Sequence, residues 1–185
     1  MLKRLLPGLV TAGVVVLLAA WGLAPVFAGH AVMRAADRGD EAALERLVDF
    51  PALRISLKEA LTDEAVARLR RDPRLADKGL GGLGVMLAPM LVSGVVDVAI
   101  TPQGVAAMVS TARAPSQDGE VETRDHPRGD KPNLHKAWGY RDLNTFAITL
   151  TDRDRPDQSL ALLMERRGLF TWKLAAVDLQ TGPDA

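Results

Sequence analysis

LLPGLVTAGVVVLLAAWGL, residues 5–23, is the stretch around which this chain is organised. It follows Lys3 and Arg4, carries no charged residue, and has Thr11 as its one polar residue. At about 1.5 Å per residue, an α-helix of this length spans roughly the hydrocarbon core of a bilayer. We therefore predict that residues 1–24 form a signal-anchor transmembrane helix, with the lipid bilayer contacting Leu5 to Leu23.

Two fates are open for this helix, because a cleaved secretory signal and an uncleaved anchor begin in the same way. Val26-Phe27-Ala28 has residues that a signal peptidase tolerates, so cleavage before Gly29 is one alternative. The apolar run is longer than the roughly 7–15 residues of a signal core, and Trp21 stands where an interfacial aromatic residue would. We expect the uncleaved anchor, with secretion after cleavage near Ala28 as the alternative.

The charges at the two ends of the apolar run bear on its orientation. Lys3, Arg4 and the terminal amine favour a short N-terminus that stays in the cytoplasm. Arg34 and Arg38 lie beyond the other end and oppose this orientation. We predict a single-pass protein of the cytoplasmic (inner) membrane, with its domain facing the periplasm or the outside.

The composition of the chain excludes several classes of function. About 160 residues follow the anchor, enough for one domain with a core of its own. The chain has 23 Lys and Arg against 23 Asp and Glu residues, so no bulk charge favours nucleic acid as a partner. It has no cysteine, which removes disulfides, thiol catalysis and thiolate metal sites. We expect no cofactor and no metal.

Residues 25–112 are predicted to be the helical part of the outer domain, with about four helices. Small apolar residues recur at helical spacing over 28–38, Gly39 ends that helix, and Asp40 caps the next one. A further helix follows over 51–71, with leucines on one face.

VDFPALR, residues 48–54, is the most individual stretch of the chain. Asp49 can accept hydrogen bonds from the free N–H groups of a helix that begins near Pro51. Asp49 and Arg54 are also candidate binding residues, as a charged pair lining a pocket. We favour the helix cap, because Asp, Phe and Pro in this order satisfy the capping rules and no residue of the three then needs a binding role to explain it.

A second strongly apolar segment, Leu83 to Val98, follows a glycine-rich connection at 77–84. It is short and interrupted by a proline, so we predict a buried or surface-lying helix with Met86 and Met90 in the core. Contact with the membrane is the less favoured alternative. Thr101-Pro102 then begins another helix, with a capping hydroxyl before a proline at the first helical position.

Residues 113–136 are rich in Pro, Gly and charged residues, which predicts a flexible loop. His126 and His135 lie here with Asp125 and Asp130. These residues lack a ligand pattern, so we interpret them as solvated side chains and predict no metal site.

Residues 137–180 alternate between apolar and polar side chains, which predicts an antiparallel three-stranded meander packed on the helices. We expect strands over 138–150, 159–165 and 170–179. Turns over 152–158 and 166–168 join them. The fold class is thus α+β, with helices first and the sheet last. Tyr140 and Trp172 are candidate binding residues, and buried cross-strand packing is the favoured role of Trp172.

Several motifs together resemble a bacterial family of uncharacterised envelope proteins, the domain of unknown function DUF2939. They are ADRGD (36–40), VDFPALR (48–54) with SLK (56–58), TPQG (101–104) and LFTWKL (169–174). The resemblance covers about Pro25 to Leu179 and implies a membrane-anchored envelope domain without assigned catalytic residues. In outline, a helix pair followed by a curved sheet is also similar to the cone-shaped folds related to nuclear transport factor two or to cystatin.

These observations leave three hypotheses about function. We favour a non-enzymatic module that binds a protein or small ligand of the envelope on the concave face of its sheet. A small hydrolase or isomerase would need two polar groups among Asp49, Arg54, Tyr140 and Asp142 to converge in a pocket between sheet and helices. A structural accessory of a membrane complex would dock through the apolar segment 83–98.

Overall fold

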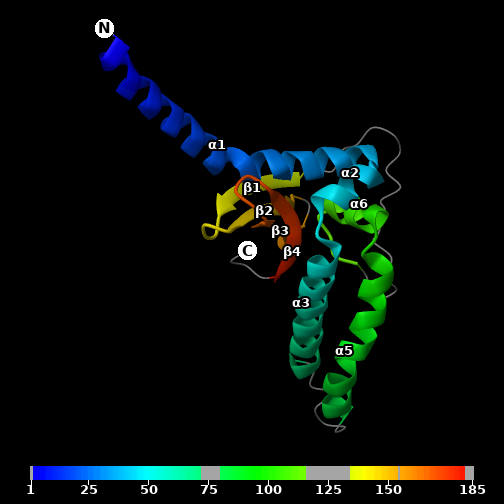
Figure 1. Cartoon of the computed structure of the whole chain (residues 1–185). Helices are drawn as coiled ribbons and strands as arrows, with labels where there is room; N and C mark the ends of the chain where they lie inside the picture. Colours follow the sequence, from blue (N-terminus) through cyan, green and yellow to red (C-terminus); the bar gives the residue numbers. More distant parts are fainter. Residues whose placement is uncertain (1, 72–79, 116–133, 154, 182–185) are drawn as a thin grey trace.

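The computed structural model of the chain describes residues 2–71, 80–115, 134–153 and 155–181. Within them the fold is α+β, with five helices followed by a four-stranded antiparallel sheet (Figure 1). The elements in chain order are α1 (Leu2–Arg38), α2 (Glu41–Leu47), α3 (Phe50–Arg71), α5 (Leu80–Ala99), α6 (Pro102–Thr111), β1 (Leu134–Tyr140), β2 (Thr145–Asp152), β3 (Arg155–Arg166) and β4 (Trp172–Thr181).

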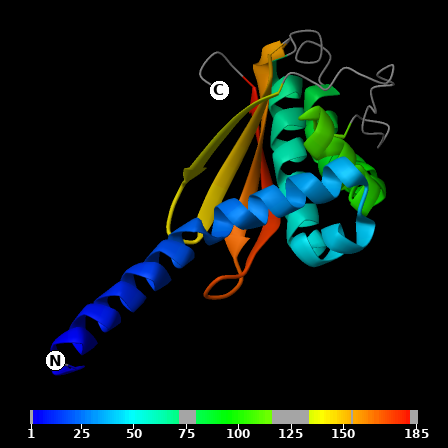
Figure 2. The same cartoon turned by 90° about the horizontal axis from the view of Figure 1, so that it is seen from above.

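The predicted anchor and the helix expected after it form one continuous helix, α1. Pro25 lies inside α1 and does not begin a second helix. A proline removes only one backbone hydrogen bond, and the later turns are held because Val32 and Ala36 are buried in the core. The earlier turns project beyond the domain (Figure 1 and Figure 2). The helix thus joins a free apolar half to a half that belongs to the fold.

The joint between α1 and α2 follows the local chemistry of its residues. Gly39 ends α1 with a φ angle of +64°, a backbone conformation that favours glycine. Asp40 Oδ1 then accepts a hydrogen bond from the Ala43 N–H at 2.9 Å. The predictions for Gly39 and Asp40 are confirmed.

The start of α6 also agrees with the sequence. Thr101 Oγ1 accepts a hydrogen bond from the Gly104 N–H at 3.1 Å, and Pro102 is the first helical residue. A side chain on Gly104 would collide with the carbonyl oxygen of Ala99. The TPQG motif therefore requires glycine at its fourth position.

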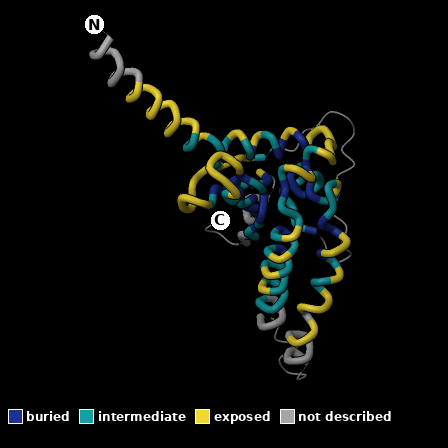
Figure 3. The backbone as a smooth tube through the Cα atoms, viewed as in Figure 1, coloured by how far each residue is buried: buried dark blue, intermediate teal, exposed yellow. Residues whose placement is uncertain are grey.

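The apolar segment 83–98 is helical as predicted, but α5 already begins at Leu80, inside the expected connection. It packs along α3, and the two helices form an arm that extends from the domain (Figure 1). The prediction that Met86 and Met90 lie in the core is wrong, because their exposed fractions are 79% and 75%. The arm is two helices thick, so one face of α5 stays exposed (Figure 3).

The sheet has four strands and not the predicted three, in the order β1-β2-β3-β4 with antiparallel neighbours. The single strand expected over 138–150 turns back between β1 and β2. Arg141 N–H donates to the Thr145 carbonyl oxygen at 3.0 Å, and Asn144 N–H donates to Asp142 Oδ1 at 2.7 Å. Alternation could not show this reversal, because both strands keep the same period on either side of it.

Two strands are longer than predicted. β1 begins at Leu134, inside the loop expected at 113–136, and β3 begins at Arg155, inside the turn expected at 152–158. The cause is pairing across the sheet, since Leu134 and Arg155 both lie opposite Asp152 on β2.

The middle of the expected loop, residues 116–133, lies outside the described residues, and so do His126, Asp125 and Asp130. His135 belongs to β1. Among the residues that the structure describes, no group of three or more His, Cys, Asp or Glu is placed to hold a metal ion.

The core lies between one face of the sheet and the helices. α1, α2 and α3 contact the sheet, and α6 packs on α1 and α2. The largest fully buried side chains come from helices and strands alike and belong to one cluster. They are Val32, Leu44, Leu53, Leu57, Ile100, Met108, Ile148, Leu150, Leu160, Leu162, Met164 and Leu174.

Candidate functional site

Asp49 lies between α2 and α3, where the chain touches β4. Its N–H donates to the Leu174 carbonyl oxygen at 2.8 Å, beside a parallel bridge between Val48 and Leu174. Its Oδ1 atom accepts a hydrogen bond from the Ala52 N–H at 3.2 Å. The predicted role of Asp49 as the cap of α3 is confirmed.

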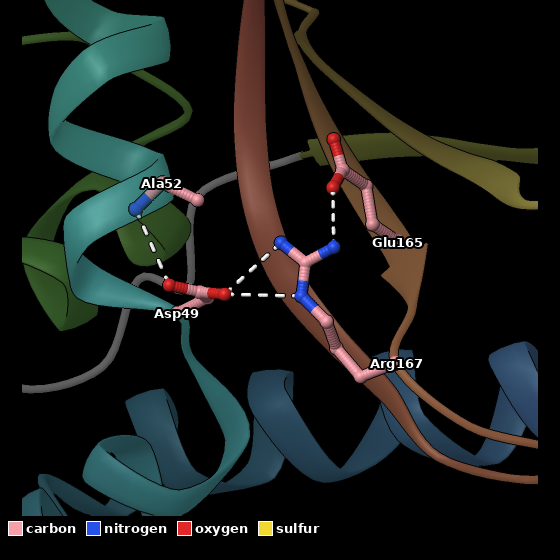
Figure 4. Close-up of polar contacts among 4 residues, drawn as sticks. All are labelled: Asp49, Ala52, Glu165 and Arg167. Atoms are coloured by element: carbon pink, nitrogen blue, oxygen red, sulfur yellow. Dashed lines mark hydrogen bonds and ion pairs between the residues drawn. The ribbon is translucent and has the colours of Figure 1, made fainter.

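The second carboxylate oxygen of Asp49 binds an arginine that the sequence did not suggest. Arg167 Nε and Nη2 each lie 3.0 Å from Asp49 Oδ2, while Arg167 Nη1 lies 2.8 Å from Glu165 Oε2 (Figure 4). These three side chains connect the start of α3 to the turn between β3 and β4. The network is partly exposed and forms a joint between elements.

The charges in this network shift the acid–base properties of its members. Partial burial raises the pKa of Asp49, but the hydrogen bonds from Ala52 and Arg167 and the positive charges of Arg167 and Lys173 outweigh it. The pKa of Asp49 therefore lies below its ordinary value. Burial lowers the pKa of Arg167, and its bonds to Glu165 and Asp49 reverse that effect and raise it. Both groups keep their charges at neutral pH.

Arg54 does not pair with Asp49. Its Nη2 atom donates to the Ile100 carbonyl oxygen at 3.0 Å, at the junction of α5 and α6. The charged pair considered for Asp49 and Arg54 is therefore not formed. Neighbouring residues of the same helix also bind distant elements. Ser56 Oγ donates a hydrogen bond to the Val177 carbonyl oxygen of β4 and accepts one from the Val177 N–H. Lys58 Nζ lies 2.9 Å from Asp97 Oδ1 of α5.

A second cluster is centred on Arg166, at the end of β3. Its guanidinium lies 4.3 Å from the ring centroid of Trp21 on α1 and 4.4 Å from that of Trp172 on β4. It also donates to the carbonyl oxygens of Leu143 at 2.7 Å and Leu169 at 3.2 Å. Arg166 thus holds α1 against two hairpin turns. Trp172 is 3% exposed, which agrees with the favoured core role.

Tyr140 and Asp142 lie at the same place on the surface. They border an open depression of about 370 Å³, lined by Trp21, Gly22, Tyr140, Arg141, Asp142 and Leu143. Tyr140 Oη donates to the Gly22 carbonyl oxygen at 2.7 Å. Hydrogen bonds from the Asn144 N–H, and from Thr145, hold the pKa of Asp142 below its ordinary value.

The chemistry available in this depression is limited by those bonds. The Tyr140 hydroxyl is engaged with the backbone of α1, and the Asp142 carboxylate stabilises its own turn. Two of the four candidate groups of the hydrolase hypothesis, Tyr140 and Asp142, therefore line the same depression, but each already has a structural partner. Arg141 binds Asp178 Oδ2 at 2.8 Å. What the depression offers to a ligand is an aromatic and aliphatic surface beside α1.

Arg166 and Arg167 are the residues that reasoning from sequence missed. The sequence of residues 166–168, Arg-Arg-Gly, predicts only a tight turn. The available signal was weak: each guanidinium group carries five N–H donors, so two adjacent arginines beside a turn can bind several partners at once. Glu165, Leu169 and Trp172 are partners close in sequence, but Asp49 lies 118 residues from Arg167 and Trp21 lies on α1, so spacing along the chain could not identify these two.

The comparisons with known proteins give one match. The family model described as Protein of unknown function (DUF2939) matches residues 14–108, just over half of the chain. The match runs from the apolar half of α1 into α6 and ends before the sheet. No curated protein matches the chain. No solved structure matches it either, so the likeness to cystatin or nuclear transport factor two stays a prediction.

Proposed function

This chain belongs to the family of proteins of unknown function DUF2939, and we propose that it is a single-pass inner-membrane protein with a non-enzymatic interaction domain in the envelope. The observation that carries the proposal is the continuity of α1. Residues 10–20 in its first half are exposed and almost all apolar, with Val16 at 68% and Leu18 at 61%, whereas Val32 in its second half is 1% exposed. Such a helix holds a domain at a fixed place on a bilayer without a linker.

Contacts made by residues 21–28 support an anchor that remains attached. Trp21 stacks on Arg166, and Gly22 accepts the hydrogen bond from Tyr140. Three further residues of this stretch pack against the core: Ala24, Val26 and Ala28. Cleavage before Gly29 would remove all of these contacts, so the proposal takes the signal-anchor and not the secreted form.

The test is the location and the N-terminus of the full chain in the cell. Intact mass measurement on membrane and soluble envelope fractions should find the chain complete and in the membrane fraction. A reporter that is active only outside the cytoplasm, fused to the C-terminus, should be active. A soluble product that starts near Gly29, or an inactive reporter beside an active cytoplasmic one, would overturn the proposed topology.

The exposed face of α5 favours a second candidate function, that of a structural accessory in a membrane complex. Met86 and Met90 are one turn apart, as are Leu87 and Leu91, and all four are more than half exposed. In Figure 1 the free half of α1 runs to the upper left of the domain, whereas the arm extends downward from it. A bilayer around α1 is therefore out of reach of the arm, and a protein helix with an apolar face is the occupant that fits.

Site-specific photo-crosslinking in cells tests this second candidate. A crosslinker at Met90 should give one discrete adduct that re-forms from the purified partner, and the same group at exposed Glu45 on α2 should give none. An adduct of two copies of this chain would assign the face to self-association. Equal labelling at both positions would remove the docking role.

A further inference from the structure

Two hairpin turns lie together at one end of the sheet. In an antiparallel meander the β1–β2 and β3–β4 connections lie at the same end of the strands. Here they cover residues 141–144 and 167–171. Arg166 donates to Leu143 in the first turn and to Leu169 in the second. We name these two turns the hairpin tips. One arginine thus fixes them relative to each other.

The hairpin tips expose large apolar side chains where turns usually carry polar ones. Leu143 is 70% exposed, Leu169 is 65% exposed, and Phe170 is 44% exposed. All three stand at the ends of the two turns and outside the core cluster. The bonds that order the turns are made by backbone groups and by the polar side chains of Asp142 and Arg166, and they include the bond from the Arg167 N–H to the Thr171 carbonyl oxygen at 2.8 Å. The apolar side chains therefore do not hold the turns together.

The position of the tips along α1 indicates what covers them. Trp21 stacks on Arg166 and Gly22 accepts a hydrogen bond from Tyr140, so the strand residues next to the tips meet α1 directly after its exposed residues 10–20. At about 1.5 Å of rise per residue, Trp21 is only about 5 Å along the axis from Leu18. Figure 2 shows both tips beside the middle of α1. A bilayer that surrounds the first half of α1 ends at the level of the tips.

We infer that the hairpin tips are a second membrane-contact site, in which Leu143, Leu169 and Phe170 enter the interfacial layer of the lipid bilayer. This inference rests on the proposed membrane anchor. Aromatic and aliphatic side chains at this depth replace water with lipid around apolar surface. With α1 as the first attachment and the tips as the second, the domain has a defined tilt, and the α3–α5 arm is directed away from the membrane.

The absence of cysteine from the chain makes the test direct. Single cysteines at Leu143→Cys and Leu169→Cys carry a nitroxide in the full chain, reconstituted in nanodiscs of phosphatidylcholine and phosphatidylglycerol. Accessibility to oxygen, which concentrates in lipid, is compared with accessibility to a water-soluble nickel complex. Val15→Cys in the free half of α1 is the lipid reference, and Glu45→Cys on α2 is the water reference.

We expect the labels at both tips to have an oxygen-to-nickel ratio between the two references and several-fold above that of Glu45→Cys. A ratio at the tips equal to the water reference, with Val15→Cys in lipid, would overturn this inference and leave the anchor intact. A label at Val15 that behaves as in water would instead overturn the proposed anchor. Tip labels shielded from both reagents would indicate a protein contact and would also reject lipid.

Discussion

At the scale of single residues, the adjacent arginines of the β3–β4 turn hold together parts of the chain that are far apart in sequence. Arg166 lies between two tryptophan rings, and Arg167 binds the carboxylate that caps α3. The planar guanidinium group explains both roles, because it stacks on aromatic faces and donates several hydrogen bonds in fixed directions. Neither residue supplies a reactive group, and both act by positioning backbone elements.

The two roles of Asp49 can be separated by substitution. Asp49→Ala removes the cap and the ion pair, and we expect a loss of about 1–2 kcal/mol in the free energy of unfolding. Asp49→Asn keeps a capping oxygen and loses the charge, so its loss should be below about 1 kcal/mol. Tryptophan fluorescence during denaturant unfolding of the full chain in detergent measures both. Equal losses for the two variants would contradict a separate capping role.

The dependence on pH follows from the lowered pKa of Asp49. The folded state favours the carboxylate, so the stabilisation is complete above the unfolded pKa of about 3.9 and is lost as pH falls through the folded value. The difference in unfolding free energy between wild type and Asp49→Asn should therefore be constant at neutral pH and shrink in acid. A difference that grew as pH fell below that range would refute this assignment.

Arg166 is tested by a substitution that keeps its charge. Arg166→Lys loses the stacking plane and the paired donors, so we expect a loss of about 1–2 kcal/mol. Arg141→Lys is the matched control, because a single ammonium can still reach Asp178, and its effect should stay below about 1 kcal/mol. The measurement is the unfolding free energy of each variant in detergent. Equal effects at both positions would argue against stacking as the cause.

At the scale of elements, α1 depends on close contact with the sheet at a single glycine. A Cβ atom on Gly29 would lie 2.5 Å from Ile148 Cδ1 and 2.8 Å from the ring of Trp138. Ile148 is fully buried, so it has no free space into which it can move. The half of α1 that belongs to the domain therefore lies so close to the sheet that a larger residue at position 29 would force the side chains of Ile148 and Trp138 to shift.

Two alanine substitutions on α1 test this contact. Gly29→Ala should destabilise the domain by about 1–3 kcal/mol through overpacking, reduced by the better helix propensity of alanine. At Gly22 an added Cβ meets nothing within 4 Å, so Gly22→Ala should be neutral or stabilising by up to about 1 kcal/mol. Thermal unfolding followed by circular dichroism compares the two. A stabilising Gly29→Ala would show that α1 sits further from the sheet.

The family motifs also have a meaning at this scale, because they lie at the joints between elements. ADRGD holds the glycine and the cap between α1 and α2, and TPQG begins α6. The start of α3 is bonded to two other parts of the fold. Arg54 donates to Ile100 at the junction of α5 and α6, and Ser56 donates to Val177 of β4. These motifs thus specify how the elements are joined.

At the scale of the whole molecule, three parts have distinct surroundings. Residues 10–20 of α1 are exposed and almost all apolar, the domain has one core, and the arm exposes an apolar face of α5. The described residues contain one helix that is long and apolar enough to cross a membrane by itself. The helices Pro89–Ala99 and Pro102–Thr111 are together also long and apolar enough, although they are bent by 98°. The second of them lies in the core, because Val105 is fully buried.

The arm provides the prediction that belongs to this scale. Met86→Ser with Met90→Ser should change the unfolding free energy by no more than about 0.5 kcal/mol, since both side chains are exposed. It should also abolish crosslinking from a probe at Leu91. Leu57→Ala, at a fully buried position of α3, should cost about 2–5 kcal/mol. A strongly destabilising serine pair would show that this face is packed and would remove the docking surface.

Short-range chemistry was enough to predict the apolar helix, the Gly39 stop, the caps at Asp40, Asp49 and Thr101, and the α+β class, because each depends on residues within a few positions of one another. Several features depended on packing instead. The continuity of α1 through Pro25, the reversal between β1 and β2, the exposure of α5 and the partners of Arg166 and Arg167 were decided by contacts between distant segments. Hydrophobic periodicity shows that a face is apolar, and only the tertiary arrangement decides whether another element covers it.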